Sequence, residues 1–178
     1  MRIGIPAEIS PGETRVAATP ETVKKLTAGG RHSVIVQNGA GTEASVPDSE
    51  FTAAGATLGC AADVYGQSDI VLKVAGPEPS ELPLLRRGRI LVGLLSPHED
   101  LSALAATGVT AFAMERLPRI TRAQSMDVLS SQANIAGYKA VIVGAHEYGR
   151  FMPMLMTAAG TVKAARVLVL GAGVAGLQ

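Results

Sequence analysis

Short apolar runs alternate along the chain with segments of helical periodicity. The apolar runs predict β-strands at residues 2–6, 33–37, 69–74, 89–95 and 109–114. Turn signals close three of them, at Asn38-Gly39, Gly76-Pro77 and Ser96-Pro97. Helix signals lie between strands, with N-terminal caps at Thr19, Asp48 and Asp100 and stops at Gly29-Gly30, Gly55 and Gly108. This alternation predicts an α/β fold, a mostly parallel sheet flanked by helices, of the Rossmann or flavodoxin-like type.

A proline-free segment from Gln124 to about Arg150 predicts one long helix. Ile135, Tyr138 and Ile142 follow the spacing of a single apolar face, and at 1.5 Å per residue the helix would run about 40 Å. We interpret its second half as a link between two subdomains and place the boundary near residue 145. Residues 1–145 would form an N-terminal α/β subdomain with the linking helix, and residues 146–178 the start of a second, Rossmann-type subdomain.

The second subdomain is predicted from the sequence RVLVLGAGVAGLQ, residues 166–178, in which an apolar strand enters a G-x-G-x-x-G turn. In a dinucleotide-binding unit Gly171 would allow the tight turn, Gly173 the close approach of the pyrophosphate, and Gly176 close packing of helix on strand. Only two residues follow Gly176, too few for the helical turn on which the pyrophosphate rests. The acidic ribose ligand expected about 20 residues later is also outside this chain. We therefore expect a truncated Rossmann unit.

Polar side chains gather in the segment LPRITRAQSMDVLSSQANIAGY, residues 117–138. Pro118 predicts a loop before the long helix, and in that helix Gln124, Asp127 and Ser131 would share one face. An amide and a carboxylate together can recognise a carboxamide such as that of nicotinamide. A helix cap with a solvated Arg–Asp pair explains the same residues, and on their chemistry alone we favour the cap.

Two cations lie nearer the N-terminus. Lys73 falls inside an apolar strand, where a charged group needs a partner. Arg15 follows a glycine-containing turn and could bind a carboxylate through its two-pronged guanidinium. Internal ion pairs, for example with Glu8 or Glu13, explain both residues equally well.

Composition removes several classes of function. The 178 residues carry sixteen basic and fifteen acidic side chains, a net charge of +1, which gives no footprint for nucleic acid. A single cysteine, Cys60, excludes an internal disulfide framework and fits a reducing compartment. The three histidines lack metal-ligand spacing, so we expect no metal site. The longest uncharged apolar stretch, residues 151–162, is too short for a spanning helix, which needs about 20 residues, so we expect no direct membrane insertion.

Taken together, five stretches resemble the NAD(H)-binding domain I of the alpha subunit of proton-translocating NAD(P) transhydrogenases. The resemblance covers the whole chain, and the run PRITRAQSMD…SSQANIAGY is highly specific to that family. A more distant likeness is to alanine dehydrogenases, which share the fold. The stretches are MRIGIPAEISPGETRVAATPETVKKL, QNGAGTEASVPDSEFTAAGA, DIVLKVAGP, AMERLPRITRAQSMDVLSSQANIAGYKAV and TAAGTVKAARVLVLGAGVAGLQ.

The resemblance implies a hydride transfer from NADH to NADP⁺ that is held on a partner domain, coupled to proton translocation. It implies that Arg119 contacts NAD(H) and pairs with Asp127, and that Gln124 and Ser130 orient the nicotinamide. Ile120, Thr121 and Arg122 would line the site with Arg119, and the glycine turn would contribute Gly171, Gly173, Val174 and Gly176. Hydride transfer between two nicotinamides needs positioning and no general base, which suits these polar residues, with Arg119, Gln124 and Asp127 as the catalytic set.

The family also implies partners and a location. Domain I would form a homodimer, bind transmembrane proton-channel and NADP-binding components, and lie in the cytoplasm at the inner face of the cell membrane. Because the family's domain I is about twice this length, we expect an N-terminal piece that is inactive alone.

Two alternatives stay open. An alanine dehydrogenase would use Arg15 and Lys73 to bind an oxo acid, but Ser96 stands where that family has its strand-end histidine, and His98 is two residues away. A non-catalytic domain that dimerises or docks on the complex without cofactor is the other.

Overall fold

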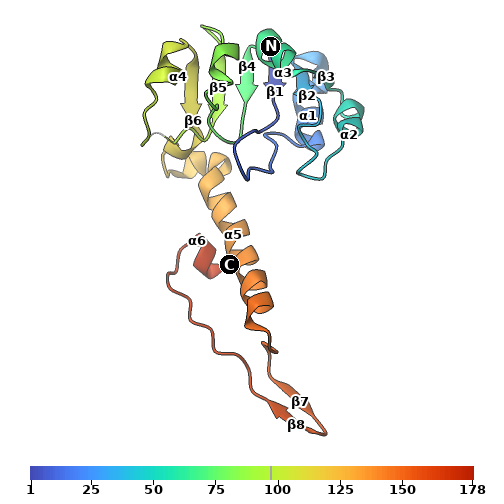
Figure 1. Ribbon diagram of the computed structural model, residues 1–178, viewed down its shortest axis with the longest axis vertical. Helices are drawn as coiled ribbons and strands as arrows, with labels where there is room; N and C mark the ends of the chain where they lie inside the picture. Colours follow the sequence, from blue (N-terminus) through green and yellow to red (C-terminus); the bar gives the residue numbers. More distant parts are fainter. Residues whose placement is uncertain (97) are drawn as a thin grey trace. The chain divides into compact units, whose positions relative to one another are not determined.

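The computed structural model describes residues 1–96 and 98–178, which form two compact units, Met1–Pro118 and Arg119–Gln178 (Figure 1). The units are described separately below. Their division reflects which residues pack together, so the subdomain boundary proposed near residue 145 stays a prediction. Pro97, expected to help close a strand, lies outside the described residues.

The first unit contains a six-stranded sheet in the order β3-β2-β1-β4-β5-β6, with every neighbouring pair parallel (Figure 1). This confirms the α/β, mostly parallel fold predicted from the alternating runs. The bounds of the strands are β1 Arg2–Ile5, β2 Ser33–Gln37, β3 Thr57–Gly59, β4 Ile70–Leu72, β5 Ile90–Gly93 and β6 Thr110–Ala113. The sequence prediction missed β3, whose three residues are too few to show alternation.

Helices and short 3₁₀ turns connect these strands. Thr19 caps the first helix as predicted, since its hydroxyl accepts from the Thr22 amide and Pro20 occupies the first turn. Asp48 was predicted as a cap but lies inside the next helix, and its carboxylate accepts from the Gly39 amide instead. The elements are α1 Pro20–Thr27, η1 Ala28–Gly30, α2 Asp48–Ala53, α3 Ala61–Gln67, η2 Leu82–Leu84, α4 Ser102–Ala106 and η3 Met114–Arg116.

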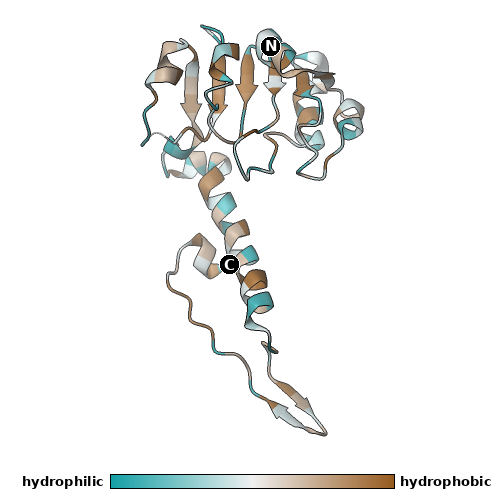
Figure 2. Ribbon diagram, in the orientation of Figure 1, coloured by the Kyte–Doolittle hydropathy of each residue, from teal (hydrophilic) through white to brown (hydrophobic). Residues whose placement is uncertain are grey.

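The core of the first unit is made of aliphatic side chains on both faces of the sheet. The strands are mainly brown in Figure 2, as expected of a parallel sheet covered on both sides. Leu91 on β5 is fully buried, which is worth about 1.5–3 kcal/mol relative to exposure. One cluster joins Ile3, Ile5, Val23, Val34, Val36 and Phe51, and a second joins Tyr65, Val71, Leu85, Leu91, Leu95 and Leu104.

The second unit has little sheet. It consists of η4 Thr121–Met126, α5 Val128–Tyr148, the hairpin β7 Leu155–Thr157 with β8 Gly160–Val162, and α6 Val174–Leu177. The long helix was predicted from Gln124 but begins at Val128, because Asp127 adopts a non-helical backbone and caps it. The helix ends at Gly149, whose φ of 63° is left-handed. Its length is therefore about 30 Å rather than 40 Å.

Two expectations about the C-terminal segment are wrong. Residues 166–170 form no strand and are exposed, Leu168 by 81% and Leu170 by 88%. A strand exists only through hydrogen bonds to a neighbouring strand, and none of the described residues supplies one. The residues after the glycine turn do form a short helix, α6, which begins within the G-x-G-x-x-G sequence rather than after it.

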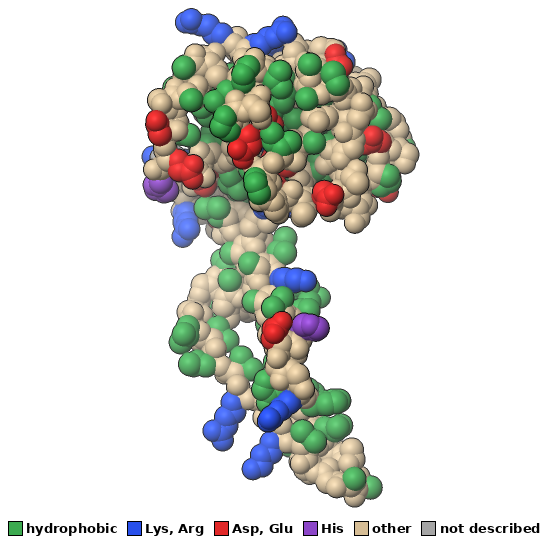
Figure 3. Space-filling model, viewed as in Figure 1, with side chains coloured by type: hydrophobic (Ala, Val, Ile, Leu, Met, Phe, Trp, Pro, Cys, Tyr) green, Lys and Arg blue, Asp and Glu red, His purple; other side chains and the backbone are tan. Residues whose placement is uncertain are grey.

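Apolar side chains remain exposed over much of the second unit, as the green atoms along it show (Figure 3). The predicted apolar face of α5 is one example, with Ile135, Tyr138 and Ile142 all exposed. A helix that is apolar on all sides is typical of a buried position. None of the helices in the described ranges has both the length and the apolar composition that a membrane span requires.

Candidate functional site

The polar segment that precedes α5 is organised by Asp127. Its carboxylate accepts from the Ser130 amide at 3.0 Å and from the Ser130 hydroxyl at 2.6 Å. The hydroxyl bond, the amide bond and the nearby charge of Arg119 together hold the pKa of Asp127 below its usual range. The cap interpretation of this residue is therefore confirmed, and Asp127 is a carboxylate that stays ionised and fixes Ser130.

The shared helical face predicted for Gln124, Asp127 and Ser131 is wrong. Gln124 lies in the 3₁₀ segment η4, before α5 begins, so the spacing of an α-helix does not apply to it. Ser131 turns to the backbone, and its hydroxyl donates to the Asp127 carbonyl oxygen at 3.1 Å. Short-range bonds of an Asp side chain compete with the helix in this way and displace its start.

The predicted cofactor residues before Asp127 project into solvent. This group, Arg119, Ile120, Thr121, Arg122 and Gln124, is exposed throughout. Arg119 influences Asp127 through its charge, but in the described part of the chain no ion pair joins the two. The segment thus presents two guanidinium groups and an amide beside a fixed carboxylate and hydroxyl.

The glycine turn is tightly folded. Gly171 has a φ of 114°, which a side chain would strain, and Gly173 is the N-cap of α6. A Cβ on Gly176 would collide with the carbonyl oxygen of Gly171, so the third glycine allows the turn to close on itself. Val174 is the first residue of α6. The turn also lies against α5, since a Cβ on Gly137 would collide with the carbonyl oxygen of Ala175.

Beside that contact, α5, α6 and residues 165–170 enclose a groove of about 850 Å³. Its lining is mainly apolar and includes Val141, Tyr148, Leu168 and Leu170. The groove has the character of a packing surface rather than of a polar binding site.

In the first unit, Lys73 is buried between two carboxylates. Its ammonium lies 2.8 Å from Glu81 Oε1 and 3.3 Å from Glu8 Oε2. Tyr65 donates to the same Glu81 oxygen at 2.7 Å, and burial, followed by Glu81, raises the pKa of the Tyr65 phenol. The predicted ion pair with Glu8 is confirmed, whereas Glu81 was missed because nothing in its spacing shows that the chain returns to Lys73.

Arg15 makes the second ion pair that we considered. Its Nε lies 2.7 Å from Glu13 Oε1 and its second terminal nitrogen 2.6 Å from Glu13 Oε2. The hydrogen bond from Arg15 is the main cause that lowers the pKa of Glu13. Both cations that an oxo acid would need are thus already engaged by carboxylates. Among the described residues no cluster of His, Cys, Asp and Glu has the geometry of a metal site.

Comparison with known proteins identifies relatives. The sequence model described as "Alanine dehydrogenase/PNT, N-terminal domain" matches residues 4–136, and its C-terminal counterpart matches residues 140–178. An NAD(P) transhydrogenase subunit alpha from Rhodospirillum rubrum is 53% identical over 187 residues, which cover all of this chain and 48% of that protein. An alanine dehydrogenase from Mycobacterium tuberculosis is 38% identical over 183 residues, covering 99% of this chain and 48% of that protein.

A solved structure agrees with these relatives. The transhydrogenase of Sinorhizobium meliloti matches with a TM-score of 0.95 at 51% identity, covering all of this chain and 52% of that one. The resemblance drawn from the sequence motifs is confirmed. The chain spans about half the length of the curated relatives that it matches.

We expect the variant Lys73→Met to lower the free energy of unfolding by about 3–5 kcal/mol, because it leaves two buried carboxylates without their cation. Urea unfolding followed by circular dichroism measures the loss. The matched control is Lys25→Met, which removes an exposed pair with Glu21 and should leave stability almost unchanged. Equal losses in the two variants would contradict the role given to Lys73.

We expect Ser130→Ala to raise the pKa of Asp127 toward its usual value, because the hydroxyl bond is the largest cause of the lowering. Since the folded-state pKa is depressed, the cap stabilises α5 above the unfolded pKa and is lost as pH falls through the folded pKa. Carboxyl ¹³C NMR against pH measures both. Ser131→Ala is the control, because that hydroxyl bonds the Asp127 carbonyl and not its carboxylate. A carboxyl titration unchanged in Ser130→Ala would refute the assignment.

Proposed function

Because the chain belongs to the alanine dehydrogenase/PNT family, we propose that it is part of the NAD(H)-binding component of a proton-translocating NAD(P) transhydrogenase. In this role NADH bound to the component gives a hydride to NADP⁺ on a partner domain, and the transfer is coupled to proton movement through a membrane partner. The proposal concerns a portion of that component, since the chain spans about half the length of its relatives.

The observation that carries the proposal is the identity of 53% to a transhydrogenase subunit, against 38% to an alanine dehydrogenase. The chemistry of the candidate site supports it. Hydride transfer between two nicotinamides requires the rings to be held in contact and requires no general base. The segment around Asp127 offers cations, an amide and a hydroxyl, and no histidine.

We assign the roles as follows. Arg119, Ile120, Thr121 and Arg122 line the NAD(H) site, where exposed guanidinium groups suit the anionic phosphates. Gln124 and Ser130 orient the nicotinamide carboxamide, which an amide and a hydroxyl can match.

Asp127 acts by holding Ser130, since both of its carboxylate oxygens already accept from that residue. Pairing with Arg119 would then occur when cofactor draws the two together. The glycine turn, through Gly171, Gly173, Val174 and Gly176, would contact the cofactor from the second unit.

The alanine dehydrogenase alternative is weaker. It needs a proton donor at the oxo acid, and Ser96 rather than histidine follows β5. Arg15 and Lys73 are both paired with carboxylates, which supports a structural role for them. The non-catalytic alternative, a domain that docks without cofactor, differs from the proposal in whether NAD(H) binds once the domain is complete.

The proposed partners follow from the same role. They are a second copy of the chain in a homodimer, a transmembrane proton channel and an NADP(H)-binding component. The protein would then lie in the cytoplasm, peripheral to the inner face of the cell membrane.

We expect residues 1–178 alone to bind NADH more weakly than about 100 μM, equivalent to about −5.5 kcal/mol. The physical reason is that residues 166–170 have no strand partner among the described residues, so the glycine turn lacks a rigid support. A titration followed by nucleotide fluorescence measures the affinity. A micromolar dissociation constant would contradict this expectation.

We expect a chimera of residues 1–178 with the remaining half of the Rhodospirillum rubrum relative to bind NADH and to transfer hydride to NADP⁺ in the presence of the NADP-binding component. Gln124→Ala should slow the transfer about 10- to 100-fold, about 1.4–2.7 kcal/mol, because the nicotinamide loses its orientation. The control is Gln67→Ala on α3, an exposed glutamine of the first unit, which should have no effect.

Three outcomes distinguish the rival functions. Hydride transfer that depends on Gln124 supports the proposal. Reduction of pyruvate by NADH and ammonium would favour the alanine dehydrogenase alternative instead. A folded chimera that binds no NADH would favour the docking domain.

A further inference from the structure

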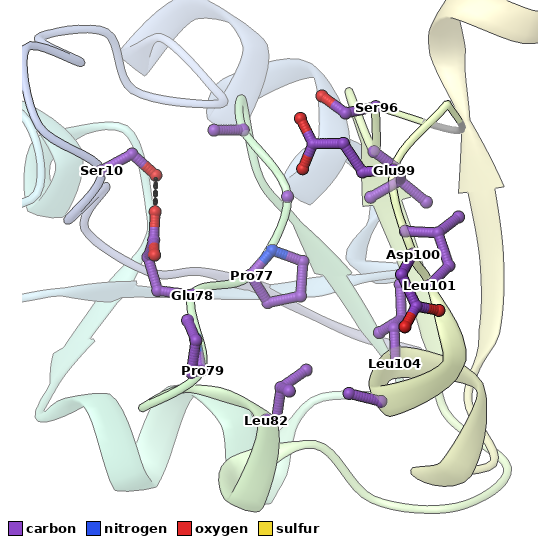
Figure 4. Close-up of a pocket in the computed structure, with 14 residues that line it drawn as sticks. Ser10, Pro77, Glu78, Pro79, Leu82, Ser96, Glu99, Asp100, Leu101 and Leu104 are labelled. Carbon is purple, nitrogen blue, oxygen red and sulfur yellow. Dashed lines mark hydrogen bonds between the residues drawn. The ribbon is translucent and has the colours of Figure 1, made fainter.

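A second cavity lies wholly within the first unit, at the carboxyl ends of β4 and β5 (Figure 4). Its volume is about 420 Å³. One wall is the segment 75–79 after β4, another is 95–104 around the start of α4, and Ser10 reaches it from the loop after β1. In the order β3-β2-β1-β4-β5-β6 the chain reverses direction between β1 and β4. Ligands of open α/β sheets bind in the crevice at such a switch point.

The segment that forms the first wall is held by the buried ion-pair cluster. Glu8 accepts from the amides of Val74 and Ala75, at 2.6 and 3.3 Å, and Glu81 accepts from the Glu78 amide at 2.8 Å. Lys73 holds both carboxylates. The backbone of the wall is therefore fastened at both ends by groups that lie behind it, which is how a preformed binding site is built.

The lining combines an apolar floor with carboxylates. Leu82, Leu95 and Leu104 contribute the floor, and Glu78, Glu99 and Asp100 contribute charge, with no Lys, Arg or His among the lining residues.

Two of the three carboxylates keep oxygens available to a ligand. Asp100 is occupied at the start of α4, where it accepts from Ser102. Glu78 accepts from Ser10 at 2.7 Å through one oxygen. Its other oxygen and the whole carboxylate of Glu99 make no hydrogen bond within the described ranges, so two negative groups remain available.

This chemistry excludes a nucleotide. The loop after β1 reads PAEISPG, residues 6–12, and lacks the glycine fingerprint that lets a pyrophosphate approach the backbone. The lining carboxylates would repel phosphate oxygens. A ligand with an apolar body and one positive charge meets both halves of the lining.

We propose that this cavity binds a small organic amine, with its hydrocarbon part on the leucine floor and its ammonium beside Glu78 and Glu99. The site is separate from the candidate NAD(H) residues, all of which lie in the second unit, and it does not rest on the proposed transhydrogenase function. Its ligand class is the alkyl- or arylammonium ions, which contact carboxylates while they bury carbon.

The test compares three probes with the same six-carbon chain, hexylamine, 1-hexanol and hexanoate, on the ¹⁵N-labelled 178-residue chain. We expect hexylamine to bind with a dissociation constant of about 1–10 mM, with NMR shift changes confined to residues 75–82 and 95–104. Hexanol should bind about three- to fivefold more weakly and hexanoate not measurably, because only the amine gains from the carboxylates.

The variant Glu99→Gln should weaken hexylamine binding about three- to fivefold and leave hexanol binding unchanged. Glu43→Gln is the matched control, because Glu43 is an exposed carboxylate outside the cavity. Equal affinity for all three probes would show a merely apolar groove and overturn the proposal. Shift changes outside the two segments, or no hexylamine binding while an oligolysine peptide binds, would overturn it as well.

Discussion

The arrangement of the first unit depends on how the charge of Lys73 is satisfied. An ammonium at the end of β4 is out of reach of water and must find anions inside the protein. Glu8 comes from the loop after β1 and Glu81 from the segment before η2, so one cation connects three parts of the chain. Each carboxylate also accepts backbone amides of the segment between Val74 and Glu78. A charge that is costly to bury thereby fixes the backbone at the edge of the sheet where ligands of such folds bind.

The two units differ in how their backbone is satisfied. Each inner strand of the first unit bonds to two neighbours, and its side chains are covered on both faces. In the second unit the segment 166–170 has the composition of a strand but no neighbour among the described residues. The same residue types thus give a rigid sheet in one unit and an exposed segment in the other. The difference is in pairing and not in propensity.

Much of the fold could be predicted from local pattern. The parallel sheet, the cap at Thr19 and the long helix before Gly149 all follow from signals within a few residues of each other. What could not be predicted depends on distant contacts or on competing short bonds. The partner Glu81 of Lys73 is set by the path of the chain after β4. The start of α5 is set by Asp127, whose side chain bonds Ser130 and breaks the helical pattern that would have placed Gln124 on the same face.

The candidate site shows the same limit. Composition supplied the residue types, and the family resemblance supplied their roles, but neither indicated that the carboxylate of Asp127 is already occupied. A residue that caps a helix and also belongs to a binding segment connects the two. Any ligand that draws on Ser130 competes with the first turn of α5.

The contact between Gly137 and the Ala175 carbonyl sets a limit on sequence variation. A methyl group at residue 137 would occupy the volume of that oxygen. Glycine there acts as a socket for the C-terminal turn, so the position has an alphabet of one letter. By contrast Gly144, seven residues further along the same helix, faces open space and is free to drift in evolution without moving the turn.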